Sequence, residues 1–321
     1  MALKQISTYN NAFFIENEYV TLEKVNETKH INDLLLSLSK NKDFKKYNFI
    51  FCCSQKNNIY ESTYIPLPNK VLFIWGDTQG KIPLKEVIDN HSFVFKAHMS
   101  PNNLCYKNFF AYPLGIPKNV ELLNIENINS RPIDIFFAGN LNSNRKLFLT
   151  QLLGNNWFLK FISLLLLIPK IGNILKPFLI DKFFWNLDKI RKNSIIRFTK
   201  AFQAGFQATE YSKILSKSKI VLSPKGFHDS ECFRFYEATR QGCVVITEKL
   251  PTHEFYNYTD AYIEIDTWHN INDIIDDLLR NPQKLEKISK NAITYYNEKL
   301  SPSGVANYIW AKIHKSEIFT I

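Results

Sequence analysis

Residues 218 to 247 limit what this chain can fold into more than any other stretch does. A short β-branched apolar run is ended by a Pro-Lys-Gly loop at Gly226, as expected of a buried strand followed by a turn. Four side chains then recur at near-helical spacing, namely Cys232, Phe235, Tyr236 and Thr239. We expect Asp229 or Ser230 to cap this helix and Gly242 to end it in a left-handed conformation. A second apolar run follows, so the pattern predicts a strand, a helix and a strand in a parallel sheet.

The loop after the first of these strands has the chemistry of an anion site. Such loops open at the carboxyl edge of a parallel sheet, where free N–H groups of the helix attract negative charge. Gly226 permits close backbone approach, and Lys225 and Arg234 add positive charge, so a diphosphate fits. No glycine-rich dinucleotide or triphosphate motif is present. Asp229 and Glu237 are two helical turns apart on the expected helix, and Glu237 could accept two ribose hydroxyls.

These residues resemble the donor-sugar half of GT-B glycosyltransferases, and the exostosin-like group most closely. The resemblance rests on the Pro-x-Gly loop, the acidic residue after it, the sequence F-R-x-Y-E-A and the G-C-V-V strand. A second stretch, residues 134 to 140 followed by Asn144 and Arg145, is similar to the first strand and phosphate-side loop of the same domain.

The resemblance implies an α/β fold with two Rossmann-like domains facing across a cleft, and a C-terminal helix crossing back. It implies a hexosyltransferase with a nucleotide-diphosphate sugar as donor and a glycan or glycolipid as acceptor, in the biosynthesis of surface polysaccharide or lipopolysaccharide. Inverting chemistry without a metal or another cofactor is also implied. Carried over by position, the donor-binding residues are Arg145, Lys225, Gly226 and Arg234 at the diphosphate, Asp229 at the sugar, where related enzymes often have Glu, and Glu237 at the ribose.

Each of these residues also has a structural interpretation. Arg234 and Glu237 stand three apart and could form an exposed ion pair on a helix surface. Asp229 is suited to an N-cap whatever else it binds. Cys232 and Cys243 are better explained as small buried apolar side chains than as ligands or nucleophiles.

Apolar runs and turn signals divide the chain into two α/β regions. We expect an acceptor-side domain over residues 1–125, a donor domain over 126–300 with an apolar insertion at about 155–205, and a terminal helix over 301–321 that returns to the first domain. Strands are predicted at the short apolar runs 49–53, 71–75 and 93–95, and the stretch 109–117 is predicted to be a strand that runs into a turn. Helices are predicted at 30–40, 209–218, 271–279 and 285–296, and from 301 past 313. The polar stretch 124–132 is the predicted linker.

An inverting enzyme of this kind needs a base in the first domain that reaches the acceptor hydroxyl. Asp77 and His98 each follow a predicted strand and are the two candidates. The alternative is that Asp77 only shapes a turn after Gly76, and that His98 is an ordinary surface or core histidine.

Residues 157–185 are strongly apolar, carry lysines and two prolines, and have aromatic ends. No uninterrupted apolar run there reaches the ~20 residues of a membrane-spanning helix. The composition suits an element that lies on an anionic membrane surface, with lysines extending to the headgroups. A helical hairpin packed on the domain explains it equally well.

The cysteines, the N-terminal sequence and the net charge restrict the partners and the cellular compartment that we expect for this protein. Five cysteines without a disulfide or metal spacing, and an N-terminus without an export signal, predict a cytoplasmic protein, possibly peripheral on the inner face of the plasma membrane. The net charge of +10 comes with no nucleic-acid motif, so we expect no nucleic-acid partner. Two rival functions remain: a polyol-phosphate transferase of similar build, and a non-catalytic membrane or nucleic-acid binding protein.

Overall fold

The computed structural model describes residues 2–6, 9–53, 56–75, 81–104, 106–154, 156–166, 179, 182–183, 187–199, 205–227, 229–258 and 260–318. The chain divides into two compact units. Unit 1 contains residues 1–118, 251–257 and 296–321, and unit 2 contains residues 119–250 and 258–295. The first crossing of the chain therefore follows Lys118, ahead of the expected boundary at 125, and the C-terminal segment belongs to unit 1.

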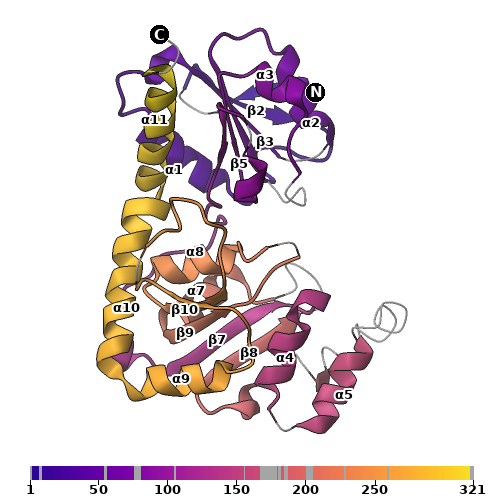
Figure 1. Cartoon of the computed structure of the whole chain (residues 1–321), viewed down its shortest axis with the longest axis vertical. Helices are drawn as coiled ribbons and strands as arrows, with labels where there is room; N and C mark the ends of the chain where they lie inside the picture. The colour runs from indigo at the N-terminus through magenta and orange to yellow at the C-terminus, as the bar shows by residue number, and fades with distance from the viewer. Residues whose placement is uncertain are drawn as a thin grey trace. The chain divides into compact units, whose positions relative to one another are not determined.

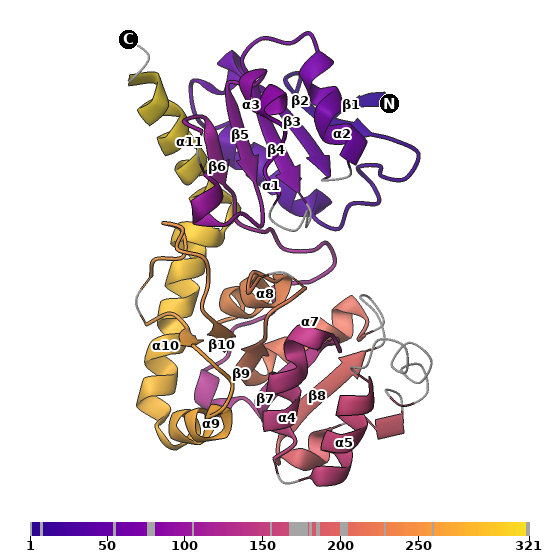
Figure 2. The same ribbon diagram turned by 45° about the vertical axis from the view of Figure 1, so that its right-hand side comes forward.

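Unit 1 is built on one six-stranded sheet in the order β1-β2-β3-β4-β5-β6. Strand β1 is antiparallel to β2, and the remaining neighbours are parallel. The strands, which Figure 2 shows side by side, are β1 (Ala2–Gln5), β2 (Ala12–Glu16), β3 (Asn48–Cys53), β4 (Lys70–Trp75), β5 (Phe93–Lys96) and β6 (Phe109–Ala111). The helices are α1 (Thr28–Leu38), α2 (Lys56–Glu61), α3 (Lys85–Asp89) and α11 (Pro302–Ile318), with short turns η1 (Phe44–Lys46), η2 (Ser62–Tyr64) and η3 (Pro101–Asn103) and the π-helix η8 (Tyr296–Leu300).

The central strands of this sheet read as continuous apolar runs because both of their faces are covered. Aromatic rings stack across neighbouring strands, as between Phe51 and Phe73, whose centroids are 4.8 Å apart. Helices α1 and α11 pack against each other, and Trp310 Nε1 of α11 donates to Leu38 O at the end of α1 (3.3 Å). The predicted strands at β3 to β6 and the predicted helix at α1 are confirmed. Strands β1 and β2 were not predicted.

Unit 2 is built on a five-stranded, fully parallel sheet in the order β11-β10-β9-β7-β8. Its strands are β7 (Ile133–Asn140), β8 (Ser194–Thr199), β9 (Ser218–Ser223), β10 (Val244–Glu248) and β11 (Ile263–Ile265). Its helices are α4 (Lys146–Leu152), α5 (Trp157–Leu166), α7 (Ala208–Ser216), α8 (Phe233–Arg240), α9 (Ile271–Arg280) and α10 (Pro282–Tyr295), with short turns η4 (Ile128–Ser130), η5 (Ser143–Arg145) and η7 (Asp188–Ile190).

Alternate residues of each strand point to opposite faces of this sheet. Ile135 and Phe137 of β7 join the core beneath α4 and α9, which lie together on one face in Figure 1. Phe136 points the other way and contacts Tyr211 of α7, with ring centroids 5.4 Å apart. Helices α7 and α8 therefore cover the second face, and the predicted αβ layering is confirmed for this unit.

The order of the strands reverses at β7. The chain runs from β7 to β8 on one side and then returns to place β9 on the other side. In doubly wound sheets, the loops that leave the two strands at such a reversal diverge to opposite faces, and ligands bind in the crevice between them. The loops after β7 and β9 are therefore where a ligand site of this unit is expected.

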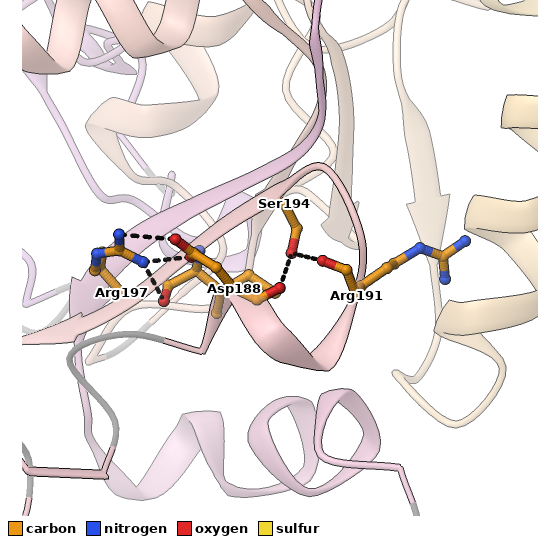
Figure 3. Close-up of polar contacts among 5 residues, drawn as sticks. Asp188, Arg191, Ser194 and Arg197 are labelled. Carbon is orange, nitrogen blue, oxygen red and sulfur yellow. Dashed lines mark hydrogen bonds and ion pairs between the residues drawn. The ribbon is translucent and has the colours of Figure 1, made fainter.

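A polar cluster fixes the start of β8 where the chain returns from the apolar segment (Figure 3). Asp188 accepts from both Nη atoms of Arg197, at 2.9 Å for Nη2, and from the backbone N–H of Ile196 at 3.0 Å. Ser194 Oγ donates to Arg191 O at 2.6 Å. Of the predicted insertion, residues 167–178 lie outside the described residues.

Two local predictions are wrong and one is confirmed. The N-cap of α8 is Cys232 and its side chain makes no capping hydrogen bond, so neither Asp229 nor Ser230 caps this helix.

The predicted linker includes Arg131, which is buried and donates to Ser218 O and Gln241 O at 2.9 Å each. Residues 124–132 belong to unit 2, where Ile128 and Arg131 are buried and most of the others are exposed. Gly242 has φ +70°, the left-handed conformation predicted for it.

Candidate functional site

The loops after β7 and β9 are joined by side-chain hydrogen bonds to backbone carbonyls. Asn144 Nδ2 donates to Gly226 O (2.9 Å) and to Phe227 O (2.8 Å). Arg145 Nε donates to Lys225 O (3.1 Å). The two stretches singled out in the sequence, about 80 residues apart, thus form one structure at the carboxyl edge of the unit 2 sheet.

Arg145 is buried in this structure and is held by neutral acceptors. Its Nη1 donates to the carbonyl and the side-chain oxygen of Asn140, both at 2.7 Å. Asn142 Oδ1 accepts from the Arg145 backbone N–H at 3.2 Å. Burial, together with the nearby charge of Arg234, lowers the pKa of Arg145 to about 10. An anion placed beside this guanidinium would reverse that effect, because an opposite charge favours the charged form.

Arg234, in the first turn of α8, brings a second guanidinium to the same place. Its Nη2 donates to Ala138 O, whereas Nε and Nη1 are buried without a hydrogen-bond partner. Its Cζ lies 4.7 Å from the centroid of the Phe137 ring, over which Arg145 also lies at 5.7 Å. Buried polar atoms are nearly always hydrogen-bonded. Two unsatisfied N–H groups next to a second cation therefore point to an absent acceptor of negative charge.

Gly139 makes room for both guanidinium groups. A Cβ built on this residue would lie 2.6 Å from Arg234 Nη2 and 2.9 Å from Arg145 Nη1, which is closer than real side chains approach. Gly139 belongs to β7 and its φ is not in the left-handed region. The glycine is thus needed for space and not for backbone conformation.

Glu237 lies one turn further along α8 and is also buried, with 6% of its surface exposed. Tyr211 Oη of α7 donates to Glu237 Oε2 at 2.6 Å. Burial raises the pKa of Glu237, and the Tyr211 hydrogen bond and the charge of Arg234 oppose that rise. The interpretation of Arg234 and Glu237 as an exposed ion pair is wrong, because both are buried and these two described residues form no ion pair. Sequence reasoning did not connect Tyr211 with Glu237.

The other predicted donor residues shape the loop after β9. The backbone N–H of Lys225 donates to Glu248 Oε2 (2.5 Å), and that of Gly226 donates to Asp229 O (2.8 Å). Asp229 Oδ1 accepts from the Glu231 backbone N–H at 3.0 Å, so it forms a local turn. Because α8 begins after Asp229, the expected relation of two helical turns between Asp229 and Glu237 does not exist.

The two candidate bases belong to unit 1. Asp77 lies outside the described residues. His98 follows β5 at the carboxyl edge of its sheet and has φ +54°, a conformation that is uncommon for non-glycine residues and is found at functional sites.

The structure adds Glu27 to this edge of unit 1. Burial raises the pKa of Glu27, and the charges of His98 and Lys118 oppose that rise. Sequence reasoning missed this residue. Glu27 is the N-cap of α1, and its side chain makes no capping hydrogen bond. Ser, Thr, Asp or Asn is usual at an N-cap. A glutamate at this position was therefore the one sign in the sequence that Glu27 could have another role. Within either unit taken alone, the described His, Cys, Asp and Glu side chains form no group of three that could ligate a metal.

Comparison with known proteins gives a fold and no sequence family. No protein-family model matches the sequence, and no curated protein is significantly similar to it. A glycosyltransferase from Rickettsia africae matches at a TM-score of 0.51 with 10% identity, over 94% of this chain and 83% of that one. HepE from Anabaena, determined with UDP and glucose, matches at a TM-score of 0.51 with 9% identity, over 88% and 81% of the two chains.

TarM is also similar, at a TM-score of 0.49 with 15% identity over 87% of this chain, but the chain spans only 58% of the length of TarM. Both sheets consist mainly of parallel strands, and the chain matches GT-B glycosyltransferases over most of its length. The protein therefore has the GT-B fold. The predicted fold class is confirmed.

Proposed function

We propose that this protein is a glycosyltransferase that moves a hexose from a nucleoside-diphosphate sugar to a hydroxyl group of a glycan or glycolipid. The observation that carries the proposal is the pair of buried guanidinium groups of Arg145 and Arg234 over Gly139, with two N–H groups of Arg234 unsatisfied. A diphosphate supplies the acceptors and the negative charge that this arrangement lacks. The HepE structure determined with UDP and glucose supports a donor of this class.

Glu237 completes the donor site in this proposal. Its buried carboxylate accepts hydrogen bonds from the two ribose hydroxyls, and Tyr211 holds it in place. Lys225 adds charge at the diphosphate, Gly226 lets the loop approach it, and Asp229 faces the sugar. The resemblance of this loop and helix to the exostosin-like group supports the same assignment.

The reaction is a single displacement. The acceptor oxygen attacks C1 of the donor sugar, the bond from C1 to the diphosphate oxygen breaks, and the acceptor proton passes to a base of unit 1. Asp77 and His98 are the candidates for that base. Arg145 and Arg234 stabilise the charge that develops on the leaving diphosphate, which is the task a metal performs in other transferases. The products are an inverted glycoside and a nucleoside diphosphate.

The proposal is tested by following nucleoside diphosphate release from UDP-sugars and GDP-sugars, with a CMP-sugar as the donor that lacks a diphosphate. We expect release from one nucleotide class, undiminished by EDTA, and an inverted anomeric configuration when a lipid-linked or glycan acceptor is added. Failure of every diphosphate donor to bind or react would reject the donor assignment. Activity that EDTA abolishes would reject metal independence.

Tyr211→Phe is expected to change how donor binding depends on pH. The lost hydrogen bond favours the ionised form of Glu237, so its removal raises the pKa of this carboxyl group further. Because ribose binding needs the ionised carboxylate, affinity falls as the pH drops through that pKa, and in the variant this fall moves to higher pH. We expect roughly 3- to 10-fold weaker UDP binding at pH 7, measured as Kd between pH 5 and 8. An equal loss at every pH would indicate only a packing role for Tyr211.

A further inference from the structure

Helix α5 presents an aromatic face to solvent. Trp157, Phe158 and Phe161 are 76%, 47% and 56% exposed, and Trp157 is the most exposed large apolar side chain in the described part of the chain. The three residues are spaced so that Phe161 lies one turn after Trp157. Soluble surfaces carry single apolar side chains commonly, but a contiguous group marks an interaction site.

The exposed rings are held together as one surface. Trp157 and Phe158 make an edge-to-face contact with centroids 6.1 Å apart, and Phe158 makes another with Phe183 at 5.9 Å. Lys182 Nζ lies 5.4 Å from the centroid of the Phe183 ring. We call Trp157, Phe158 and Phe161 the aromatic face. Because Phe183 contacts Phe158, the Lys182 ammonium group lies at the border of the aromatic face.

The inner side of α5 packs on unit 2 and borders a cavity. Ile162 joins the core of unit 2 through α4. Leu159 packs against the same core and also lines a cavity of about 670 Å³, together with Leu152 and Leu153 at the end of α4 and Ile190 of η7. Helix α5 carries one charged residue, Lys160. The rings of Trp157, Phe158 and Phe161 are exposed, and an apolar phase beside them would remove their surface from water.

The charge of the surrounding sequence identifies that phase. No Asp or Glu occurs between Asp134 and Asp181. Lys160 lies on α5 itself, and Lys182 lies beside the Phe183 ring at the border of the aromatic face. Aromatic side chains with lysines and without acids are the composition of elements that lie in the interface of an anionic membrane. No helix among the described residues has the length and hydropathy to cross one.

We propose that α5 lies along an anionic lipid surface, with the aromatic face inserted at the level of the headgroups. Trp and Phe rings enter the boundary of headgroups and acyl chains, and the lysines contact lipid phosphates. The attachment holds unit 2 at the surface where a lipid-linked acceptor would be found. It does not depend on the donor site, which is formed by the loops after β7 and β9.

Co-sedimentation of the full chain with vesicles tests this surface. We expect binding to vesicles of equal parts phosphatidylglycerol and phosphatidylcholine, weaker binding at high salt, and little binding to phosphatidylcholine alone. Trp157→Ala/Phe158→Ala/Phe161→Ala should weaken binding to the anionic vesicles by ~30-fold or more while UDP binding is unchanged. Tyr19→Ala/Tyr64→Ala removes two rings that are 70% and 65% exposed in unit 1 and should leave vesicle binding intact.

The outcomes separate this inference from the proposed function. Equal vesicle binding by the aromatic-face variant and the wild type would overturn the inference. A change from dimer to monomer in the variant, without vesicle binding by the wild type, would assign the face to a second copy of the chain and also overturn it. Trp157→Ala alone gives a second readout if the triple variant fails to fold, because tryptophan emission should then lose its blue shift on vesicle addition.

Discussion

Arg234→Met is expected to abolish nucleoside diphosphate binding without destabilising the unliganded protein. In the unliganded protein this guanidinium is buried, has two unsatisfied N–H groups and lies near Arg145. The ligand is the missing partner, and the loss of a buried charged contact weakens binding by about 2–5 kcal/mol, which is roughly 30-fold to several thousand-fold. A methionine of similar length removes two buried N–H groups that lack partners and one hydrogen bond to Ala138 O, so the free energy of unfolding should stay within ~1 kcal/mol of wild type.

Arg197→Met supplies the matched control in the same unit. Arg197, in the middle of β8, forms a two-pronged ion pair with Asp188 of η7, and this pair includes neither Arg145 nor Arg234. Its replacement should lower stability and preserve ligand binding, because the pair holds the chain in place at η7 (Figure 3). Thermal unfolding and calorimetric titration on both variants give the comparison. Breaking a buried ion pair costs ~3–5 kcal/mol. If Arg234→Met lowered the free energy of unfolding by a similar amount, Arg234 would have a structural role and the assignment to ligand binding would be contradicted.

Gly139→Ala is expected to weaken donor binding by about 10- to 100-fold, or ~1.4–2.7 kcal/mol, through a single methyl group. That methyl would meet both guanidinium groups at distances below 3 Å, so at least one must leave its position. The β7 backbone itself accepts alanine, and the displaced groups are the ends of long side chains. We therefore expect the variant to fold, with a loss in ligand affinity that exceeds its loss in stability.

Gly205→Ala is the control glycine for this change. Among the described residues, a Cβ there would meet Thr199 Cγ2, at 3.6 Å, which is ordinary contact. Titration of each variant with UDP and GDP measures the difference. Unchanged affinity in Gly139→Ala would mean that the close approach of Arg145 and Arg234 has no part in ligand binding.

Much of unit 2 could be predicted because its signals are local. A β-branched run, a Pro-x-Gly loop and Gly242 each restrict the backbone around them, and the strands and the left-handed end of α8 follow from them. The start of α8 could not be predicted in the same way. Asp229 suits an N-cap and also a turn that closes on its own backbone. The turn is the form observed, with Glu231 N–H as the donor.

The parts of the site that escaped prediction depend on contacts between distant residues. Tyr211 and Glu237 are 26 residues apart on two helices, and their hydrogen bond follows only from how α7 and α8 pack on one face of the sheet. Gly139 faces Arg234, 95 positions further along the chain, and a glycine at the end of a strand gives no sign of what lies opposite. Strands β1 and β2 are short and lie at one edge of their sheet, so their apolar runs carry little signal.

The most direct test of the donor site is calorimetric titration of the wild-type chain with nucleoside diphosphates and the matching monophosphates, repeated on Arg234→Met. We expect one nucleoside diphosphate to bind at a single site, its monophosphate to bind at least ten times more weakly, and the variant to bind neither. At 100 times its Kd the ligand should stabilise the wild type by about 2.7 kcal/mol. Absence of binding by every diphosphate, or equal binding of monophosphate and diphosphate, would contradict the assignment of Arg145 and Arg234 to a diphosphate.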